Sequence, residues 1–220
     1  LHDALPIYRS NTFPRDLWPK IGALGLHGIT VEEEYGGSGL GYLEHCIAVE
    51  EISRASASVG LAYGAHSNLC VNQIRRNGNE AQKRKYLPKL ISGEHVGSLA
   101  MSEPGAGSDV VSMKTRAEKK GDSWVVNGQK IWTSYANYAD WIFCLVRTDP
   151  AAKKHDGISF ILFDMTSKGV STKPILLISG YSPFCETFFD DVRVEKENLI
   201  GTLNRGWDVA KALLAHERTM

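Results

Sequence analysis

The sequence predicts an α+β fold in three parts: an all-α helical domain at residues 8–96, a β-sandwich or barrel domain at residues 97–195, and the first helix of a C-terminal helical bundle at residues 196–220. Apolar residues recur at helical spacing in the first part, and short β-rich runs separated by turn residues fill the second. Helical spacing then returns at Gly206–Thr219. A chain of 220 residues is long enough for two domains.

The first part divides into helices separated by glycine-containing turns. Asn79 and Gln82 have the spacing of a capping box, which opens the last of these helices. The helix at Leu40–Ala57 carries apolar residues on more than one side, so we expect it to be buried. The predicted helices cover residues 13–24, 40–57, 58–76 and 79–90.

The second part is punctuated by turn residues between β-rich runs. Asn127-Gly128 stands between the two arms of Trp124–Trp132 and has the composition of a two-residue hairpin turn, which needs positive backbone angles. Turns such as Asp156-Gly157 separate the other runs. Further strands are predicted at 141–147, 158–163, 170–175 and 187–194.

The last predicted helix carries an apolar face that has no evident partner in the sequence. Trp207, Ala210, Leu213 and Leu214 lie on one side of it, and the pattern runs to Met220 without a C-cap. We therefore expect this chain to be a fragment whose remaining helices are missing.

Composition and motifs exclude several classes of function. Lysine plus arginine balance aspartate plus glutamate at 25 each, so neither nucleic acid nor a membrane surface is an expected partner. The four cysteines lack metal-ligand spacing, so we expect no metal and interpret them as buried thiols in a reducing compartment. Gly105-Ala106-Gly107 has Val110 where a dinucleotide-binding motif needs its third glycine, and Gly36–Gly39 lacks the lysine of a phosphate-binding loop. Leu1–Ile7 is too short and lacks the basic start of a signal peptide, so no targeting segment is expected.

The segment Leu99–Ser108 carries the strongest chemical signal. A strand-like entry runs into a turn that offers two hydroxyls, a carboxylate and two glycines. Glycine lets a backbone approach a ligand closely, and serine hydroxyls both donate and accept hydrogen bonds. Such a turn suits a flat, polar-edged molecule lying across the end of a sheet.

Several motifs in order along the chain resemble acyl-CoA dehydrogenases. They are Tyr35–Leu40, Leu99–Ser108 and Asn127–Thr133, and the resemblance covers about residues 13–219. Segments of the first half, such as Tyr63–Cys70, are most similar to the isovaleryl-type branch of this family. The second half, from about Gly121, is similar to bacterial members in general.

The resemblance implies an FAD-dependent enzyme that removes two hydrogens from the α and β carbons of a short, branched acyl-CoA. A carboxylate takes the α proton, and the β hydrogen leaves as hydride to the flavin. Electrons then pass to an electron-transferring flavoprotein. A place in leucine breakdown, a homotetramer when full length, and a location in the bacterial cytoplasm or the mitochondrial matrix are further implications.

The resemblance also assigns roles to residues of this sequence. The first flavin-contacting segment is expected to comprise Leu99, Met101, Ser102, Gly107 and Ser108. The second is expected to comprise Trp132, Thr133 and Ser134. Ser108 and Arg218 are expected to contact the acyl-CoA. In isovaleryl-type members the catalytic base lies on the first helix after the β domain, next to an arginine, and Glu217 has that place.

Alternatives to this hypothesis remain open at the level of sequence. In most of the family the base lies in the C-terminal domain, and the same Glu-Arg-Thr occurs in members that resemble the second half. A straight-chain dehydrogenase, an oxidase, or a fragment that does not retain flavin are the alternative functions; we expect this fragment alone to be inactive. Ser179–Glu186 departs from the glycine-rich family pattern, with Pro183 unable to donate a backbone hydrogen bond, and Glu195 replaces a proline. Leu1–Ile7 matches nothing.

Overall fold

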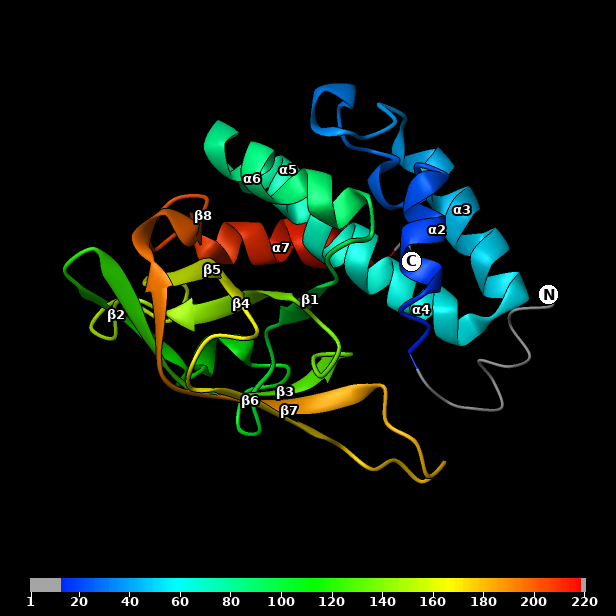
Figure 1. Ribbon diagram of the computed structural model, residues 1–220. Coiled ribbons are helices and arrows are strands. Elements are labelled where there is room, and N and C mark those ends of the chain that lie inside the picture. Colours follow the sequence, from blue (N-terminus) through cyan, green and yellow to red (C-terminus); the bar gives the residue numbers. More distant parts are fainter. Residues whose placement is uncertain (1–12, 219–220) are drawn as a thin grey trace.

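The computed structural model describes residues 13–218 and consists of a layer of helices packed on one side of a β domain (Figure 1). The predicted α+β fold class is confirmed. The sequence segment Leu1–Ile7, together with Thr219 and Met220, lies outside the described residues.

The helical layer is built from five α-helices and a π-helical turn within the described residues. Asn79 caps the last of them: its side chain accepts from the Gln82 amide at 2.9 Å, and the Gln82 side chain accepts from the Asn79 amide at 2.9 Å, which confirms the capping box. Short 3₁₀ turns at Leu26–Gly28 and Glu33–Tyr35 connect the early helices. The helices are α2 (Leu17–Ala23), α3 (Tyr42–Ala55), α4 (Ala57–His66), α5 (Asn72–Asn77) and α6 (Glu80–Ile91), and the π turn is η3 (Ser67–Val71).

The predicted helix at 58–76 is three consecutive helical segments rather than one regular helix. Between α4 and α5, the turn η3 widens to π-helical hydrogen bonding. All five of its residues are buried. Single π turns inside α-helices occur often at functional sites, and η3 lies next to the site described below.

The expectation that the helix at Leu40–Ala57 is buried is wrong. Within α3 only His45 and Val49 are buried, whereas Leu43 is 70% exposed and Ile47 is 52% exposed. The apolar residues on its second face therefore point to solvent in this chain, because no described element covers them.

Eight strands form one mixed sheet in the order β6-β7-β3-β2-β4-β5-β8, with β1 parallel to β4. Most neighbouring pairs are antiparallel, and β2 touches β4 through a single parallel pair. The predicted strands at 141–147, 158–163, 170–175 and 187–194 are confirmed as β4 to β7. The strands are β1 (Gly97–Ala100), β2 (Arg116–Lys120), β3 (Ser123–Ser134), β4 (Trp141–Arg147), β5 (Ile158–Asp164), β6 (Val170–Pro174), β7 (Phe184–Glu195) and β8 (Leu199–Ile200).

The hairpin predicted at Asn127-Gly128 is wrong, because these residues lie inside the continuous strand β3. The chain turns earlier, at Gly121-Asp122 between β2 and β3, where Gly121 adopts a φ of 63°. Gly128 lies at a β-bulge against β7, and a Cβ there would come within 2.8 Å of three atoms of Thr115. Glycine is therefore needed for close packing and for its φ of 147°, and not for a hairpin.

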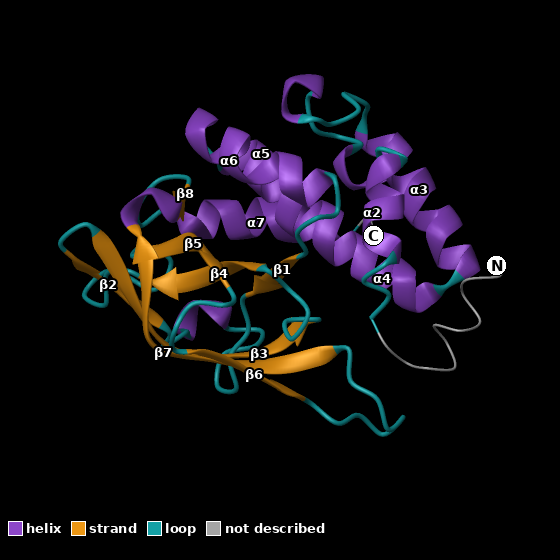
Figure 2. Cartoon of the chain, in the orientation of Figure 1, coloured by secondary structure: helices purple, strands orange, loops and turns teal. Residues whose placement is uncertain are grey.

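The sheet folds over so that β4 and β5 pack face to face on β3 and β7, which confirms the sandwich (Figure 2). Successive residues of β4 serve two cores, because strand side chains alternate between faces. Ile142 and Cys144 pack inside the sandwich with Trp124. Phe143 joins the core between the sheet and the helices, where its ring stacks on Phe160 at 4.2 Å.

Helix α7 (Gly206–Glu217) packs on β5 on one side and against η3 and α5 on the other (Figure 1). Its buried residues, Val209, Ala210 and Leu213, belong to the core between sheet and helices. The apolar face predicted for this helix is thus partly buried against other elements of this chain. No described helix is long and apolar enough to cross a membrane.

Candidate active site

A cavity of about 260 Å³ opens where the edge of the β domain meets the helices. One wall, here called the β wall, comes from the end of β1, the residues after it, and β3. The other, here called the helical wall, comes from α4, η3 and α7. The cavity is lined by Leu99, Met101, Ser102, Ile131, Trp132 and Ser134 on the β wall and by Ala65, Leu69, Leu214 and Glu217 on the helical wall.

The two predicted flavin-contacting segments are joined to each other by hydrogen bonds on the β wall. The Ile131 amide donates to the Ser102 carbonyl at 3.0 Å. The Ser98 hydroxyl donates to the Ser134 carbonyl at 2.7 Å. Segments thirty residues apart in the sequence therefore form one continuous surface.

A buried ion pair lies directly behind this surface. Lys130 Nζ contacts Glu103 Oε1 at 2.9 Å, and the two side chains are 0% and 7% exposed. Lys130 Nζ also donates to the Met101 carbonyl at 2.9 Å, while Glu103 accepts from the amides of Lys114 and Thr115. These donors lower the pKa of Glu103 despite its burial, which opposes them. The pair fixes the turn after β1 to β3.

Trp132 stands in a strained backbone conformation at the cavity. Its φ is 60°, which is rare for a large side chain, and it lies at a bulge of β3 between Lys130 and Thr133. The residue is 53% exposed, and its indole touches the Phe184 ring edge-on at 6.1 Å between ring centres. An exposed aromatic ring held at the cost of strain is a feature of binding sites.

Glu217 is the one carboxylate among the residues that line the cavity. It is the last residue of α7, and desolvation raises the pKa of its carboxyl. A raised pKa brings a carboxylate closer to the range in which it removes a proton from a weak carbon acid. The apolar residues Leu69 and Leu214 line the same cavity.

The structure brings six of the predicted site residues together and leaves four outside the cavity. Gly107 and Ser108 are exposed on the turn after β1, and a Cβ at Gly107 would meet nothing within 4 Å. Arg218 is exposed beyond the end of α7. Thr133 is 1% exposed and faces away from the cavity, with its hydroxyl buried and without a hydrogen-bond partner in the described part of the chain.

Sequence reasoning missed the residues that support the cavity. Lys130 and Glu103 lie inside the motifs singled out above, and a lysine within a β-rich run was the available signal. Ala65 and Leu69 carry no sequence signal of their own, because small and apolar residues in a helix are ordinary core residues.

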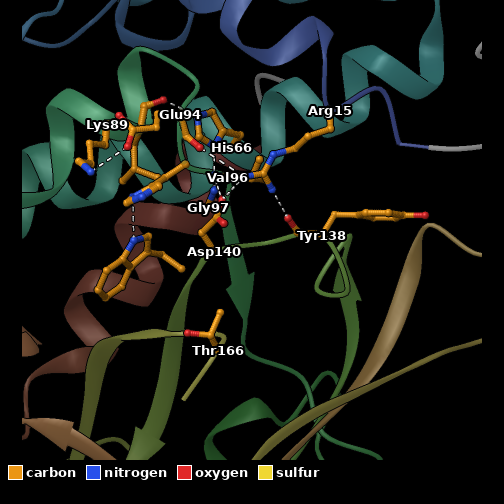
Figure 3. A network of polar contacts seen from close by, with 12 residues as sticks. Arg15, His66, Lys89, Glu94, Val96, Gly97, Tyr138, Asp140 and Thr166 are labelled. Carbon is orange, nitrogen blue, oxygen red and sulfur yellow. Dashed lines mark hydrogen bonds and ion pairs between the residues drawn. The ribbon is translucent and has the colours of Figure 1, made fainter. Parts of the chain in front are cut away.

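A polar network joins the helices to the sheet beside the cavity (Figure 3). Arg15 donates to Asp140 at 2.7 Å and to the Tyr138 carbonyl at 2.7 Å. Asp140 in turn accepts from the Val96 amide at 2.7 Å. His66 Nδ1 accepts from the first amide of β1 at 2.9 Å. These contacts join the helical layer to the beginnings of β1 and β4.

The arrangement combines a flat aromatic surface, two hydroxyls and backbone groups on one side with a single carboxylate on the other. A planar ligand with polar edges can lie against Trp132 and accept from Ser102 or Ser134. A second ligand can place an acidic C–H bond next to Glu217. The cavity thus offers hydrogen-bonding groups on one wall and one carboxylate on the other, and a carboxylate can act as a general base.

Comparison with known proteins identifies the family to which the chain belongs. Two family profiles match consecutive parts of the chain: "Acyl-CoA dehydrogenase, N-terminal domain" at residues 2–94 and "Acyl-CoA dehydrogenase, middle domain" at residues 98–192. The chain belongs to the acyl-CoA dehydrogenase family, whose members are oxidoreductases.

Individual relatives are similar over nearly the whole chain. Mitochondrial isovaleryl-CoA dehydrogenase of Pongo abelii is 52% identical over 98% of this chain and 52% of its own length. Mitochondrial 2-methylacyl-CoA dehydrogenase of Solanum tuberosum is 48% identical over 96% of this chain and 52% of its own. The crystal structure of acyl-CoA dehydrogenase from Geobacillus kaustophilus superposes with a TM-score of 0.92 at 33% identity, over 98% of this chain and 58% of that one. The chain thus spans about half the length of these relatives.

Proposed function

We propose that the protein containing this chain is an FAD-dependent dehydrogenase that converts a short, branched acyl-CoA to the 2-enoyl-CoA. The observation that carries the proposal is the single cavity in which Ser102, Trp132 and Glu217 meet from three distant parts of the sequence. Family membership and similarity to isovaleryl-CoA dehydrogenases support the substrate class.

The residues on the β wall fit a flavin. Trp132 presents an exposed ring, and Ser102 and Ser134 line the same cavity. The turn that follows has glycines at 105 and 107 beside open space, so a ligand can approach its backbone. When bound, FAD supplies the acceptor for the hydride that leaves the β carbon of the substrate.

Glu217 supplies the base. Its carboxylate lies across the cavity from the β wall, and removal of water on ligand binding strengthens its action on the α proton. The proton moves to a Glu217 carboxylate oxygen, and the C–H electron pair stays with the substrate until hydride leaves the β carbon. Leu69 and Leu214 keep that side of the cavity apolar.

The remaining parts of the proposal follow from family membership. They are an electron-transferring flavoprotein as the electron acceptor, a homotetramer, a role in leucine breakdown, and a location in the bacterial cytoplasm or mitochondrial matrix. Contact of Ser108 and Arg218 with the acyl-CoA also belongs here, and both side chains are exposed and accessible to a large ligand.

The test is to express the full reading frame that encodes this chain and to measure bound flavin and its reduction by acyl-CoAs. The proposal expects a yellow protein whose visible absorbance is bleached fastest by isovaleryl-CoA. Faster bleaching by straight-chain substrates, or reoxidation by oxygen rather than by the flavoprotein, would identify one of the alternative enzymes. A colourless protein that stays colourless with added FAD would contradict the proposal.

A further inference from the structure

The backbone carbonyl of His216, the residue before Glu217, is held from two sides by the helical layer. Asn68 Nδ2 donates to this carbonyl at 3.0 Å, and the Tyr42 hydroxyl lies 3.1 Å from it. The same hydroxyl lies 2.7 Å from Asn68 Oδ1, which closes a triangle of polar contacts. The three groups come from α3, η3 and α7, which are far apart in the sequence.

The Asn68 side chain has few other ways to satisfy its polar atoms. Asn68 is 0% exposed, so an amide group there needs partners within the protein. It occupies the π turn η3, whose neighbour Leu69 lines the cavity. Within the described residues, the Asn68 side-chain oxygen has one other contact, a long one of 3.5 Å from the Asn72 side-chain amide.

This triangle ties α7 to α3 and η3 one residue before Glu217. A buried side-chain amide that donates to a backbone carbonyl fixes the position of that part of the backbone. Tyr42 also packs edge-on against the His216 ring at 5.2 Å between ring centres. The position of Glu217 therefore depends on contacts made one residue earlier.

We propose that Asn68 and Tyr42 are positioning residues for Glu217. The Tyr42 hydroxyl holds the Asn68 side-chain oxygen, and the Asn68 amide then clamps the His216 carbonyl and thereby holds the Glu217 carboxylate at the cavity. The inference rests on the proposed role of Glu217 as the base. It assigns to the π turn a function beyond packing, namely the presentation of an amide donor to the backbone of α7 next to Glu217. A displacement of about 1 Å in a catalytic group can lower a rate by about 100-fold, so the clamp is a determinant of rate.

The experiment isolates proton removal from hydride transfer. An acyl-CoA with sulfur in place of the β carbon can lose an α proton but cannot lose a β hydride. Exchange of its α hydrogens for deuterium in heavy water, catalysed by the full-length protein, is followed by NMR. Its dissociation constant and the flavin content are measured on the same samples.

Asn68→Leu removes the donor at nearly constant size, and Tyr42→Phe removes only the hydroxyl. We expect exchange to slow about 10- to 100-fold in Asn68→Leu and less in Tyr42→Phe, with the flavin content and the dissociation constant unchanged. Asn77→Leu is the matched control, because Asn77 makes a similar amide contact, to the Gln73 carbonyl at 3.0 Å, but none to α7. It should exchange at the wild-type rate.

Each outcome decides. Wild-type exchange rates in both Asn68→Leu and Tyr42→Phe overturn the clamp. If Asn68→Leu fails to fold, Tyr42→Phe decides alone, and a wild-type rate in it overturns the clamp. Glu217→Gln is measured in parallel: if it exchanges at the wild-type rate, the proposed base is wrong and this inference fails with it. If Glu217→Gln exchanges slowly while Asn68→Leu and Tyr42→Phe exchange at the wild-type rate, the proposed function stands and only the clamp is rejected.

Discussion

The two walls of the cavity are supported in different ways. Behind the β wall lies a buried ion pair, Lys130 and Glu103, together with the antiparallel pairing of β3 with β7. Behind the helical wall lie neutral contacts, among them the hydrogen bond from Asn68 to the His216 carbonyl and the hydrogen bond from Tyr42 to the Asn68 side-chain oxygen. A rigid surface suits a cofactor that stays in place, whereas the other wall has a single carboxylate to hold. The difference predicts that changes on the two walls have separable effects on flavin binding and on turnover.

The largest effect on turnover should come from a substitution on the helical wall. Glu217→Gln in the full-length protein removes the base, and we expect turnover to fall by about 10²- to 10⁴-fold with flavin still bound. Steady-state assay with isovaleryl-CoA measures it. Asp208→Asn on the same helix is the control, because Asp208 pairs with Arg205 and Lys211 at the surface. Near-normal turnover in Glu217→Gln would move the base to another part of the protein.

The next largest effect, on stability and flavin content, should come from the ion pair behind the β wall. Lys130→Met leaves Glu103 buried without its partner, which is expected to lower the free energy of unfolding by about 3–5 kcal/mol and to reduce flavin content. Adding Glu103→Leu should restore part of the stability, because both charges are then gone. The exposed pair of Lys154 and Asp109 supplies the control: Lys154→Met should lower the free energy of unfolding far less than Lys130→Met, because solvent screens the exposed pair. Equal losses in both variants, measured by urea unfolding, would show that the buried pair gives no special support.

Lowering the pH should destabilise the helical layer before it destabilises the β domain. Burial lowers the pKa of His27 and of His45 to about 4, and both lie in the helical layer. The unfolded chain binds these protons near pH 6.5, so the free energy of unfolding falls as pH drops from about 6.5 to 4, by up to about 3 kcal/mol for each histidine. Glu103 has a lowered pKa, so its contribution is present above pH 4.5 and is lost only below that value.

Hydrogen exchange followed against pH measures this separation. Amides of α2 to α4 should lose protection between pH 6.5 and 4.5, before those of β3. His45→Phe should flatten that fall, because the His45 Nε2 atom is buried without a hydrogen-bond partner in the described residues and a phenyl ring removes the titration. Simultaneous loss of protection in both layers, unchanged by this substitution, would contradict the separation.

The smallest effect on stability should come from Trp132. Trp132→Gly removes an exposed ring and relieves a φ of 60°, so the free energy of unfolding should change by no more than about 1 kcal/mol. Flavin binding should nevertheless be lost. Trp132→Leu removes the ring but keeps the strain, so it should be less stable than the glycine variant. Flavin retained in both variants would exclude the indole as a contact.

Much of this fold could be predicted from the sequence because it rests on local signals. The strand at Trp141–Arg147 is a continuous apolar run, and the capping box at Asn79 is a short pattern; both are confirmed. The hairpin at Asn127-Gly128 was wrong because pairing with β2 and β7 on both edges outweighs a two-residue turn preference. Burial of α3 was wrong because apolar spacing does not show which side has a partner.

Only the site residues that lie within recognisable sequence motifs could be predicted. Ser102 and Trp132 were predicted as site residues from the family resemblance of their motifs, and their meeting with Glu217 at one cavity depends on the packing of α7 against β5 and η3. No local pattern shows that Lys130 and Glu103 pair, since twenty-seven residues separate them. The clamp at His216 joins three elements and is likewise invisible in one sequence.

One measurement tests most directly whether the β wall binds the flavin and the helical wall holds the base. It is the ratio of flavin to polypeptide in the full-length wild type, Trp132→Gly and Asn68→Leu. The wild type should hold close to one flavin per chain, Asn68→Leu should match it while turning over slowly, and Trp132→Gly should hold little. Equal flavin loss in both variants, or none in either, would show that the cavity does not divide into a cofactor wall and a base wall.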